Sequence, residues 1–160
     1  MVKLDAAWIP NRRGYSLYIR PLLIGTTESI SVCAPDRALL LVICSPVGPY
    51  FTNGFKAIKL LAVEKNVRAW PGGTGSFKIG ANYAPTIALQ KEAAARGYSQ
   101  NLWLLGSDHQ ITEFGSMNCF IILKGVDGIV ELVTPPLTDG TILPGVTRDS
   151  ILKLAKQVPE

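Results

Sequence analysis

Short apolar runs alternate along the chain with breaks that are rich in glycine, proline, asparagine and threonine. Most of the runs hold β-branched and aromatic residues at a spacing that is typical of strands. The step from Asp127 to Gly128 suits the tight turn of a hairpin between the last two runs. The pattern therefore predicts strands at residues 16–24, 37–44, 58–64, 101–105, 119–124 and 129–134.

Two segments change to a helical pattern. Residues 85–96 are rich in strong helix formers, begin with a proline that a first turn tolerates, and are followed by Gly97, a typical stop. A second helix is predicted from Thr147 to about Gln157, with one apolar stripe facing a core. Strands with two inserted helices predict an α+β fold rather than a regularly alternating, doubly wound one.

The composition is that of a folded protein. The chain has 160 residues, of which 48% are hydrophobic and 18% charged, so it can bury a full core. Its net charge is +4, but lysine and arginine are scattered, which argues against a nucleic-acid partner. The longest apolar run, residues 38–44, is far shorter than the ~20 residues of a membrane helix, and no signal-peptide core is seen. We expect a soluble, intracellular protein that binds neither nucleic acid nor membranes.

The cysteines indicate neither a disulfide framework nor a zinc site. Cys33, Cys44 and Cys119 are odd in number and show no Cys-x-x-Cys spacing. We therefore expect buried thiols and no metal centre.

A lysine lies inside the glycine-rich segment 71–83, PGGTGSFKIGANY. A phosphate-binding P-loop needs Gly-Lys-Ser/Thr, but Phe77 precedes Lys78 and Ile79 follows it. The dinucleotide fingerprint also fails, because Lys78 stands where its third glycine is required. Two interpretations remain: an exposed loop lysine, or a lysine in a tight pocket whose amine forms a Schiff base with an aldehyde.

Long motifs around this lysine resemble branched-chain amino-acid aminotransferases of the eukaryotic type. They are RAWPGGTGSFKIGANYAPTIALQKEAAARGYSQNLWLLGSDHQITEFGSMN, with SLYIRPLLIGT before it and ELVTPPLTDGTILPGVTRDSIL after it. The resemblance runs from about residue 15 to about residue 155 and implies a fold-type IV aminotransferase. That family uses pyridoxal 5′-phosphate and forms dimers of two-domain subunits, so we expect this cofactor and a homodimer.

The resemblance implies roles for three residues at the reacting centre. Lys78 matches the lysine that binds the cofactor covalently and then moves a proton. Glu113 matches the carboxylate that keeps the pyridine nitrogen protonated, although a solvated loop glutamate is the simpler interpretation. Tyr83 matches a tyrosine whose hydroxyl approaches the cofactor's phenolic oxygen, with core packing as the alternative.

Further positions match the family's anion and substrate contacts. Val146 and Thr147 open the second predicted helix, where free amides bind phosphate, and Thr147 could instead cap the helix. Ser116 stands where relatives commonly carry threonine, and Phe114 replaces a more usual valine. The more loosely matched positions around the substrate pocket are Tyr18, Arg20 and Tyr50, and an arginine there is more often a surface ion pair.

The resemblance also implies how the chain is organised. Residues 1–50 match the end of a small first domain and its connection, and residues 51–160 match a lysine-bearing large domain that lacks its C-terminal part. We therefore expect a fragment of a longer protein, without the first-domain arginine and the C-terminal turn that complete the phosphate site. A cytoplasmic or a mitochondrial location is equally compatible with the sequence.

The implied activity is the transfer of the amino group of Leu, Ile or Val to 2-oxoglutarate, in branched-chain amino-acid metabolism or biosynthesis. Two alternatives stay open. One is another fold-type IV activity, such as a D-amino-acid aminotransferase or a lyase. The other is a catalytically incomplete remnant that acts as a binding or interaction fragment.

Overall fold

The computed structural model describes residues 1–50, 54 and 56–157. Its internal contacts divide the chain into two compact units, Met1–Lys56 and Ala57–Glu160. The domain boundary that the sequence predicts after residue 50 falls beside residues 51–53, which lie outside the described part, and it stays a prediction.

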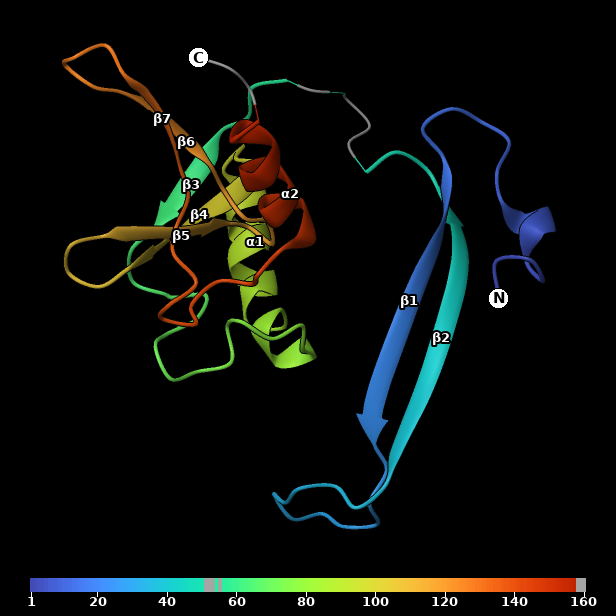
Figure 1. Cartoon of the computed structure of the whole chain (residues 1–160). Helices are drawn as coiled ribbons and strands as arrows, with labels where there is room; N and C mark the ends of the chain where they lie inside the picture. The colour runs from blue at the N-terminus through green and yellow to red at the C-terminus, as the bar shows by residue number, and fades with distance from the viewer. Residues whose placement is uncertain (51–53, 55, 158–160) are drawn as a thin grey trace. The chain divides into compact units, whose positions relative to one another are not determined.

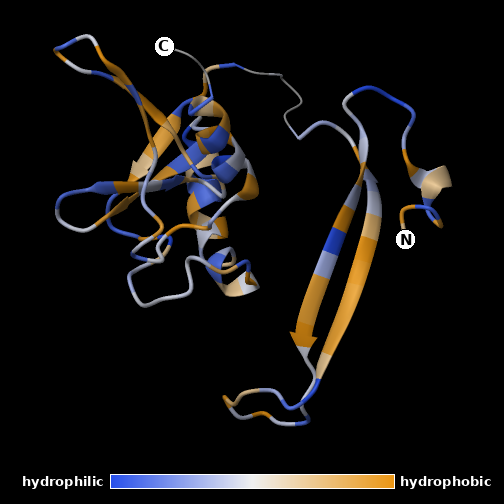
Figure 2. Cartoon of the chain, in the orientation of Figure 1, coloured by the Kyte–Doolittle hydropathy of each residue, from blue (hydrophilic) through white to orange (hydrophobic). Residues whose placement is uncertain are grey.

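The first unit is a short 3-10 helix, η1 (Ala6–Trp8), followed by an antiparallel hairpin of β1 (Ser16–Gly25) and β2 (Ala38–Val47) (Figure 1). Both strands were predicted, and both are longer than predicted. Figure 2 shows that the two strands are largely apolar along their length. Many of these side chains are exposed, including Leu23 at 71% and Leu40 at 66%, because two strands alone bury little surface.

The second unit is built on a three-stranded sheet in the order β3-β4-β5. Strand β3 (Leu60–Val63) runs parallel to β4 (Gln100–Leu105), which pairs antiparallel with β5 (Gln110–Phe114). Helix α1 (Thr86–Ala95) lies between β3 and β4 in sequence and packs against β4. Such a crossover is what joining two parallel strands requires.

The remaining elements of this unit are a hairpin, a helix and a single turn. Strands β6 (Ile121–Lys124) and β7 (Val130–Val133) form the hairpin, and α2 (Val146–Ala155) follows it along the chain. The 3-10 helix η2 (Gly80–Asn82) comes directly after Lys78 and Ile79. The helices end within two residues of their predicted limits, and Gly97 has the left-handed φ of +79° that ends α1.

The core of this unit lies between the sheet and the loops that cross it. Its most buried large side chains are those of Trp103 and Ile142, each 1% exposed. Polar side chains are buried beside them, namely Arg68, Asn82, Asn101, Thr112, Glu113 and Thr141. Burial of so many polar groups is unusual for a small core and indicates a site rather than packing alone.

Two expectations from the sequence are wrong. Strand β5 was not predicted, because QITEF contains three polar residues and no regular apolar alternation. The cysteines do not share one environment: Cys119 is buried, Cys44 is half-buried and Cys33 is exposed. The predicted α+β class is confirmed, with mixed strands and two principal helices.

Candidate active site

The loop that carries Lys78 is held from inside by the amide of Asn82. Its Nδ2 donates to the carbonyl oxygens of Thr74 at 2.6 Å and Phe77 at 2.7 Å. Its Oδ1 accepts a hydrogen bond from the Thr74 hydroxyl at 2.7 Å. One buried side chain thus fixes the backbone immediately before the lysine, which favours a defined path for a glycine-rich segment.

Gly75 gives this loop room to pack closely. A Cβ at this position would lie 2.6 Å from the Cβ of Ala69 and 2.8 Å from the carbonyl oxygens of Gly140 and Thr141. Its backbone is not left-handed, so the requirement is close approach and not unusual dihedral angles. Gly80, two residues after Lys78, has nothing within 4 Å of such a Cβ.

Lys78 and Tyr83 are hydrogen-bonded to each other. The ammonium Nζ donates to the Tyr83 hydroxyl at 2.6 Å and lies 4.5 Å from the centre of its ring. Lys78 is exposed in this chain, and its role as a Schiff-base lysine stays a prediction. Tyr83 is the C-cap residue of η2 and is half-buried, and its role at the cofactor stays a prediction.

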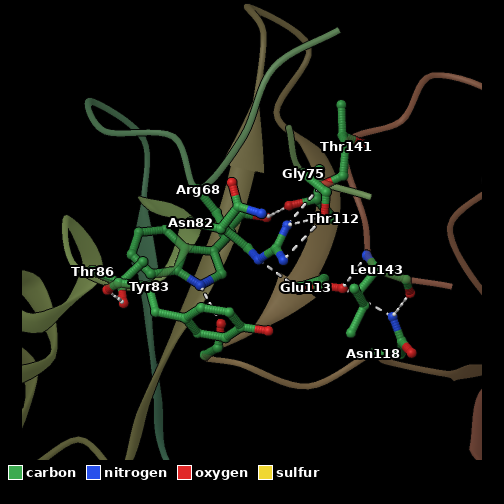
Figure 3. Close-up of polar contacts among 12 residues, drawn as sticks. Arg68, Gly75, Asn82, Tyr83, Thr86, Thr112, Glu113, Asn118, Thr141 and Leu143 are labelled. Atoms are coloured by element: carbon green, nitrogen blue, oxygen red, sulfur yellow. Dashed lines mark hydrogen bonds and ion pairs between the residues drawn. The ribbon is translucent and has the colours of Figure 1, made fainter. Parts of the chain in front are cut away.

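The centre of the site is a buried ion pair between Arg68 and Glu113. Arg68 Nε lies 2.7 Å from Glu113 Oε2, and the two side chains are 3% and 2% exposed. The other end of the guanidinium donates to the carbonyl oxygen of Thr141 at 2.8 Å, with Gly75 O at 3.4 Å. Figure 3 shows Arg68 between these carbonyls and the carboxylate. Glu113 is therefore a buried residue of β5, and the interpretation as a solvated loop glutamate is wrong.

The other oxygen of this carboxylate is bound as well. Oε1 of Glu113 accepts from the backbone N–H of Leu143 at 3.0 Å and from Asn118 Nδ2 at 2.9 Å. Burial raises the pKa of Glu113 above its usual value of 4.5, whereas the charges of Arg68 and Lys78 and these two hydrogen bonds lower it.

The N-terminus of α2 faces a cavity of about 430 Å³ that Ser116, Gly145, Val146 and Thr147 help to line. Gly145 is the N-cap residue, and no side chain caps the helix. Thr147 lies in the first turn, so the interpretation that it caps this helix is wrong. Amides of a first turn have no partner within their own helix and attract anions.

Ser116 also lines a second cavity of about 350 Å³, which Tyr83, Thr86 and Trp103 border. The indole N–H of Trp103 donates to the carbonyl oxygen of Gly115 at 2.7 Å and so supports the turn that carries Ser116. Ser116 therefore lines both the cavity beside Tyr83 and the cavity at the start of α2. Phe114 ends β5 and is half-buried.

The remaining predicted residues lie in the first unit. Arg20 Nη2 donates to the Tyr18 hydroxyl at 2.9 Å, with the guanidinium 5.2 Å from the centre of the tyrosine ring. This contact replaces the surface ion pair that was the alternative for Arg20. Tyr50 is 78% exposed. Their relation to Lys78 stays a prediction.

Sequence reasoning missed residues that connect the site. Arg68, Asn82 and Asn118 are polar, lie outside the strands and the two principal helices, and resemble ordinary surface residues in the sequence. A signal was present for Arg68, since it stands in an otherwise apolar and glycine-rich stretch that belongs to the long motif. No comparable signal marks Asn118.

Comparison with known proteins places the chain among transaminases. Residues 6–159 match the family model described as amino-transferase class IV. The chain is 59% identical over 158 residues to a cytosolic branched-chain-amino-acid aminotransferase of Saccharomyces cerevisiae, covering 98% of this chain and 42% of that protein. It is 58% identical over 150 residues to the mitochondrial enzyme of Schizosaccharomyces pombe, covering 94% of this chain and 35% of that one.

A solved structure shows the same fold. The branched-chain aminotransferase of Thermoproteus uzoniensis, solved with norvaline, matches with a TM-score of 0.71 and 30% identity. That match covers 88% of this chain and 45% of the other. The chain thus spans roughly two fifths of the length of the curated relatives named above, and the expected fold-type IV architecture is confirmed for the part present.

Arg68→Met is expected to lower the free energy of unfolding by about 3–5 kcal/mol, because it leaves the Glu113 carboxylate buried beside an apolar side chain. It should also raise the pKa of Glu113 further. Chemical denaturation measures the first effect, and NMR titration of the labelled carboxyl carbon measures the second. The matched control is Arg37→Met, which removes an exposed partner of Glu28 and should cost about 0.5 kcal/mol. Equal costs for the two variants would contradict a central role of the buried pair.

Gly75→Ala is expected to destabilise the second unit by about 1–3 kcal/mol, because the new methyl group meets backbone oxygens that cannot easily move. Gly80→Ala adds the same methyl group five residues later, at the start of η2, where nothing lies within 4 Å, and should change stability by about 0.5 kcal/mol or less. Thermal or denaturant unfolding of both variants makes the comparison. A tolerated Gly75→Ala would show that the loop does not pack against residues 140–141 as described.

Proposed function

Because the chain belongs to the class IV aminotransferase family, we propose that it carries the lysine-bearing part of a pyridoxal-phosphate site for branched-chain amino-acid transamination. The observation that supports this most directly is that the hydrogen-bonded Lys78 and Tyr83 and the buried Glu113 all belong to one compact unit. Since the chain covers 35–42% of the two yeast relatives, the activity, substrates and assembly of a whole protein are part of the proposal.

The carboxylate of Glu113 fits the ring nitrogen of the cofactor. An ionised carboxylate has about four acceptor positions, and the N–H groups of Arg68, Asn118 and Leu143 occupy three of them. One position is left for the N–H of a pyridinium. A protonated ring would also place a second cation at a carboxylate whose pKa burial raises, and it would favour the ionised form.

The start of α2 fits the phosphate group. The amides of Val146 and Thr147 lie in the first turn of a ten-residue helix and line the cavity of about 430 Å³ together with Ser116. Both the unpaired amides and the helix dipole favour an anion there. Gly145 at the N-cap has no side chain that could cap these amides.

When bound, pyridoxal phosphate supplies a ring that withdraws electrons from the substrate's α carbon. Lys78 would have two tasks: its Nζ would hold the cofactor at the aldehyde carbon, and its free amine would move a proton from the substrate's α carbon. The Tyr83 hydroxyl, 2.6 Å from Nζ, keeps the amine in place between these tasks. Glu113 holds the proton on the ring nitrogen, and the buried guanidinium of Arg68 keeps that carboxylate oriented.

The substrates we propose are Leu, Ile and Val as amino donors and 2-oxoglutarate as acceptor. Support comes from the names of the two yeast relatives at 58–59% identity, which favour this activity over a D-amino-acid aminotransferase or a lyase. The proposal includes a homodimer, as the resemblance implies. It also includes a cytosolic or mitochondrial location, since one relative is named cytosolic and the other mitochondrial. No helix in the described part of the chain is long and apolar enough to span a membrane.

Adding pyridoxal phosphate to the purified chain is expected to give a visible absorbance band that requires Lys78. Lys78→Ala should abolish the band, because no other amine takes its place beside Tyr83. Lys124→Ala, in the exposed β6–β7 hairpin, is the matched control and should leave the band unchanged. Leucine should then reduce the band in the wild-type chain.

The result separates the candidate functions. A Lys78-dependent band without a response to leucine would favour another fold-type IV activity. A wild-type chain without any band would contradict the proposed function and favour the catalytically incomplete remnant.

A further inference from the structure

Asn118 contacts both ends of the proposed cofactor site with one amide group. It lies between β5 and β6, and its side-chain Nδ2 donates to Glu113 Oε1 at 2.9 Å and to the carbonyl oxygen of Leu143 at 2.8 Å. A carboxamide NH₂ has two hydrogens, so these two acceptors use its full donor capacity. Figure 3 shows Asn118 beside Leu143 at the end of the chain of contacts that starts at Arg68.

Leu143 stands just before α2, and its backbone belongs to the same set of contacts. Its N–H donates to Glu113 at 3.0 Å, and its carbonyl oxygen accepts from the N–H of Gly145 at 2.8 Å as well as from Asn118. Any displacement of Leu143 therefore moves the N-cap of the helix. Hydrogen bonds thus join the carboxylate in β5 to the segment just before α2, across thirty positions of sequence.

Asn118 also packs against the turn that it binds. A Cβ built on Gly145 would overlap Oδ1 of Asn118, although the φ of −68° at Gly145 is one that any residue adopts. The position thus needs glycine because the side chain of Asn118 occupies the neighbouring space, and not because the backbone dihedral angles are unusual. Nδ2 of Asn118 thus binds the carbonyl oxygen of Leu143, and its Oδ1 fills the space that a side chain at Gly145 would need.

We propose that Asn118 is a positioning residue that sets the separation between the carboxylate for the ring nitrogen and the helix N-terminus for the phosphate. This inference rests on the proposed function. In pyridoxal phosphate a rigid ring and a short arm hold the nitrogen and the phosphate at a nearly constant separation. A protein that fixes the matching separation in advance binds this molecule without reorganising.

A purely structural asparagine would behave differently from a positioning one. Loss of a structural amide weakens the binding of pyridoxal phosphate and of pyridoxal, which lacks the phosphate, by the same factor. Loss of a positioning amide weakens the binding of both compounds and, in addition, reduces the preference for pyridoxal phosphate over pyridoxal. The ratio of the two affinities therefore separates the two roles.

The experiment measures the affinity of pyridoxal phosphate and pyridoxal for wild type, Asn118→Ala, Glu113→Gln and Asn101→Ala. In Asn118→Ala the preference for the phosphorylated form should fall about tenfold, the factor that corresponds to one lost buried hydrogen bond. In Glu113→Gln both affinities should fall. The preference for the phosphorylated form should not change, because the amide of Asn118 still binds the carbonyl oxygen of Leu143. Asn101→Ala removes a fully buried amide without a hydrogen-bond partner, and it controls for lost stability.

Gly145→Ala tests the same contact from the other side. In the wild-type background it should push Asn118 aside and reduce the phosphate preference, whereas adding it to Asn118→Ala should have little further effect. Circular dichroism shows whether each variant is folded, and the Gly145→Ala arm decides the outcome if Asn118→Ala does not fold.

The outcomes for this inference and for the proposed function are distinct. A wild-type chain that binds both forms, with a preference unchanged in Asn118→Ala and in Gly145→Ala, would overturn the positioning role alone. A wild-type chain that binds neither form would overturn the proposed function and the positioning role with it.

Discussion

The buried ion pair of Arg68 and Glu113 is the interaction on which the rest of the second unit depends. Both side chains are almost fully buried, so each charge would be strongly destabilising without the other. The guanidinium also binds the carbonyl oxygen of Thr141, 73 positions further along the chain. One arginine thereby connects the glycine-rich loop, strand β5 and the segment that leads into α2. The geometry of the candidate site follows from this connection.

A buried ion pair adds little to the stability of a core, but it fixes the orientation of the two charged side chains. Apolar side chains of the same size would pack with less desolvation cost, yet they would not fix the direction of a carboxylate. Here one carboxylate oxygen faces Arg68, and the other faces Leu143 and Asn118. The orientation of Glu113 is therefore set before any ligand arrives, and preorganisation of this kind is what electrostatic catalysis requires.

The sequence predicts most of the elements but not the strand that matters most. Apolar periodicity located two helices and every strand except β5, whose residues Thr112 and Glu113 are polar and buried. Their burial depends on partners such as Arg68 that are distant in sequence, and a local pattern cannot reveal it. The long motif identified Lys78, Tyr83 and Glu113. Asn82 and Asn118 escaped notice because an amide that satisfies backbone oxygens looks the same in sequence as one that meets water.

The protonation state of the ring nitrogen is the most direct test of the central role given to Glu113. Pyridoxal phosphate labelled with ¹⁵N at the ring would be bound to the wild-type chain and to Glu113→Gln, and its nitrogen chemical shift recorded by NMR at neutral pH. A protonated nitrogen in wild type and an unprotonated one in the variant is the predicted result. An unprotonated nitrogen in the wild-type complex would contradict the assignment of the buried pair to the cofactor.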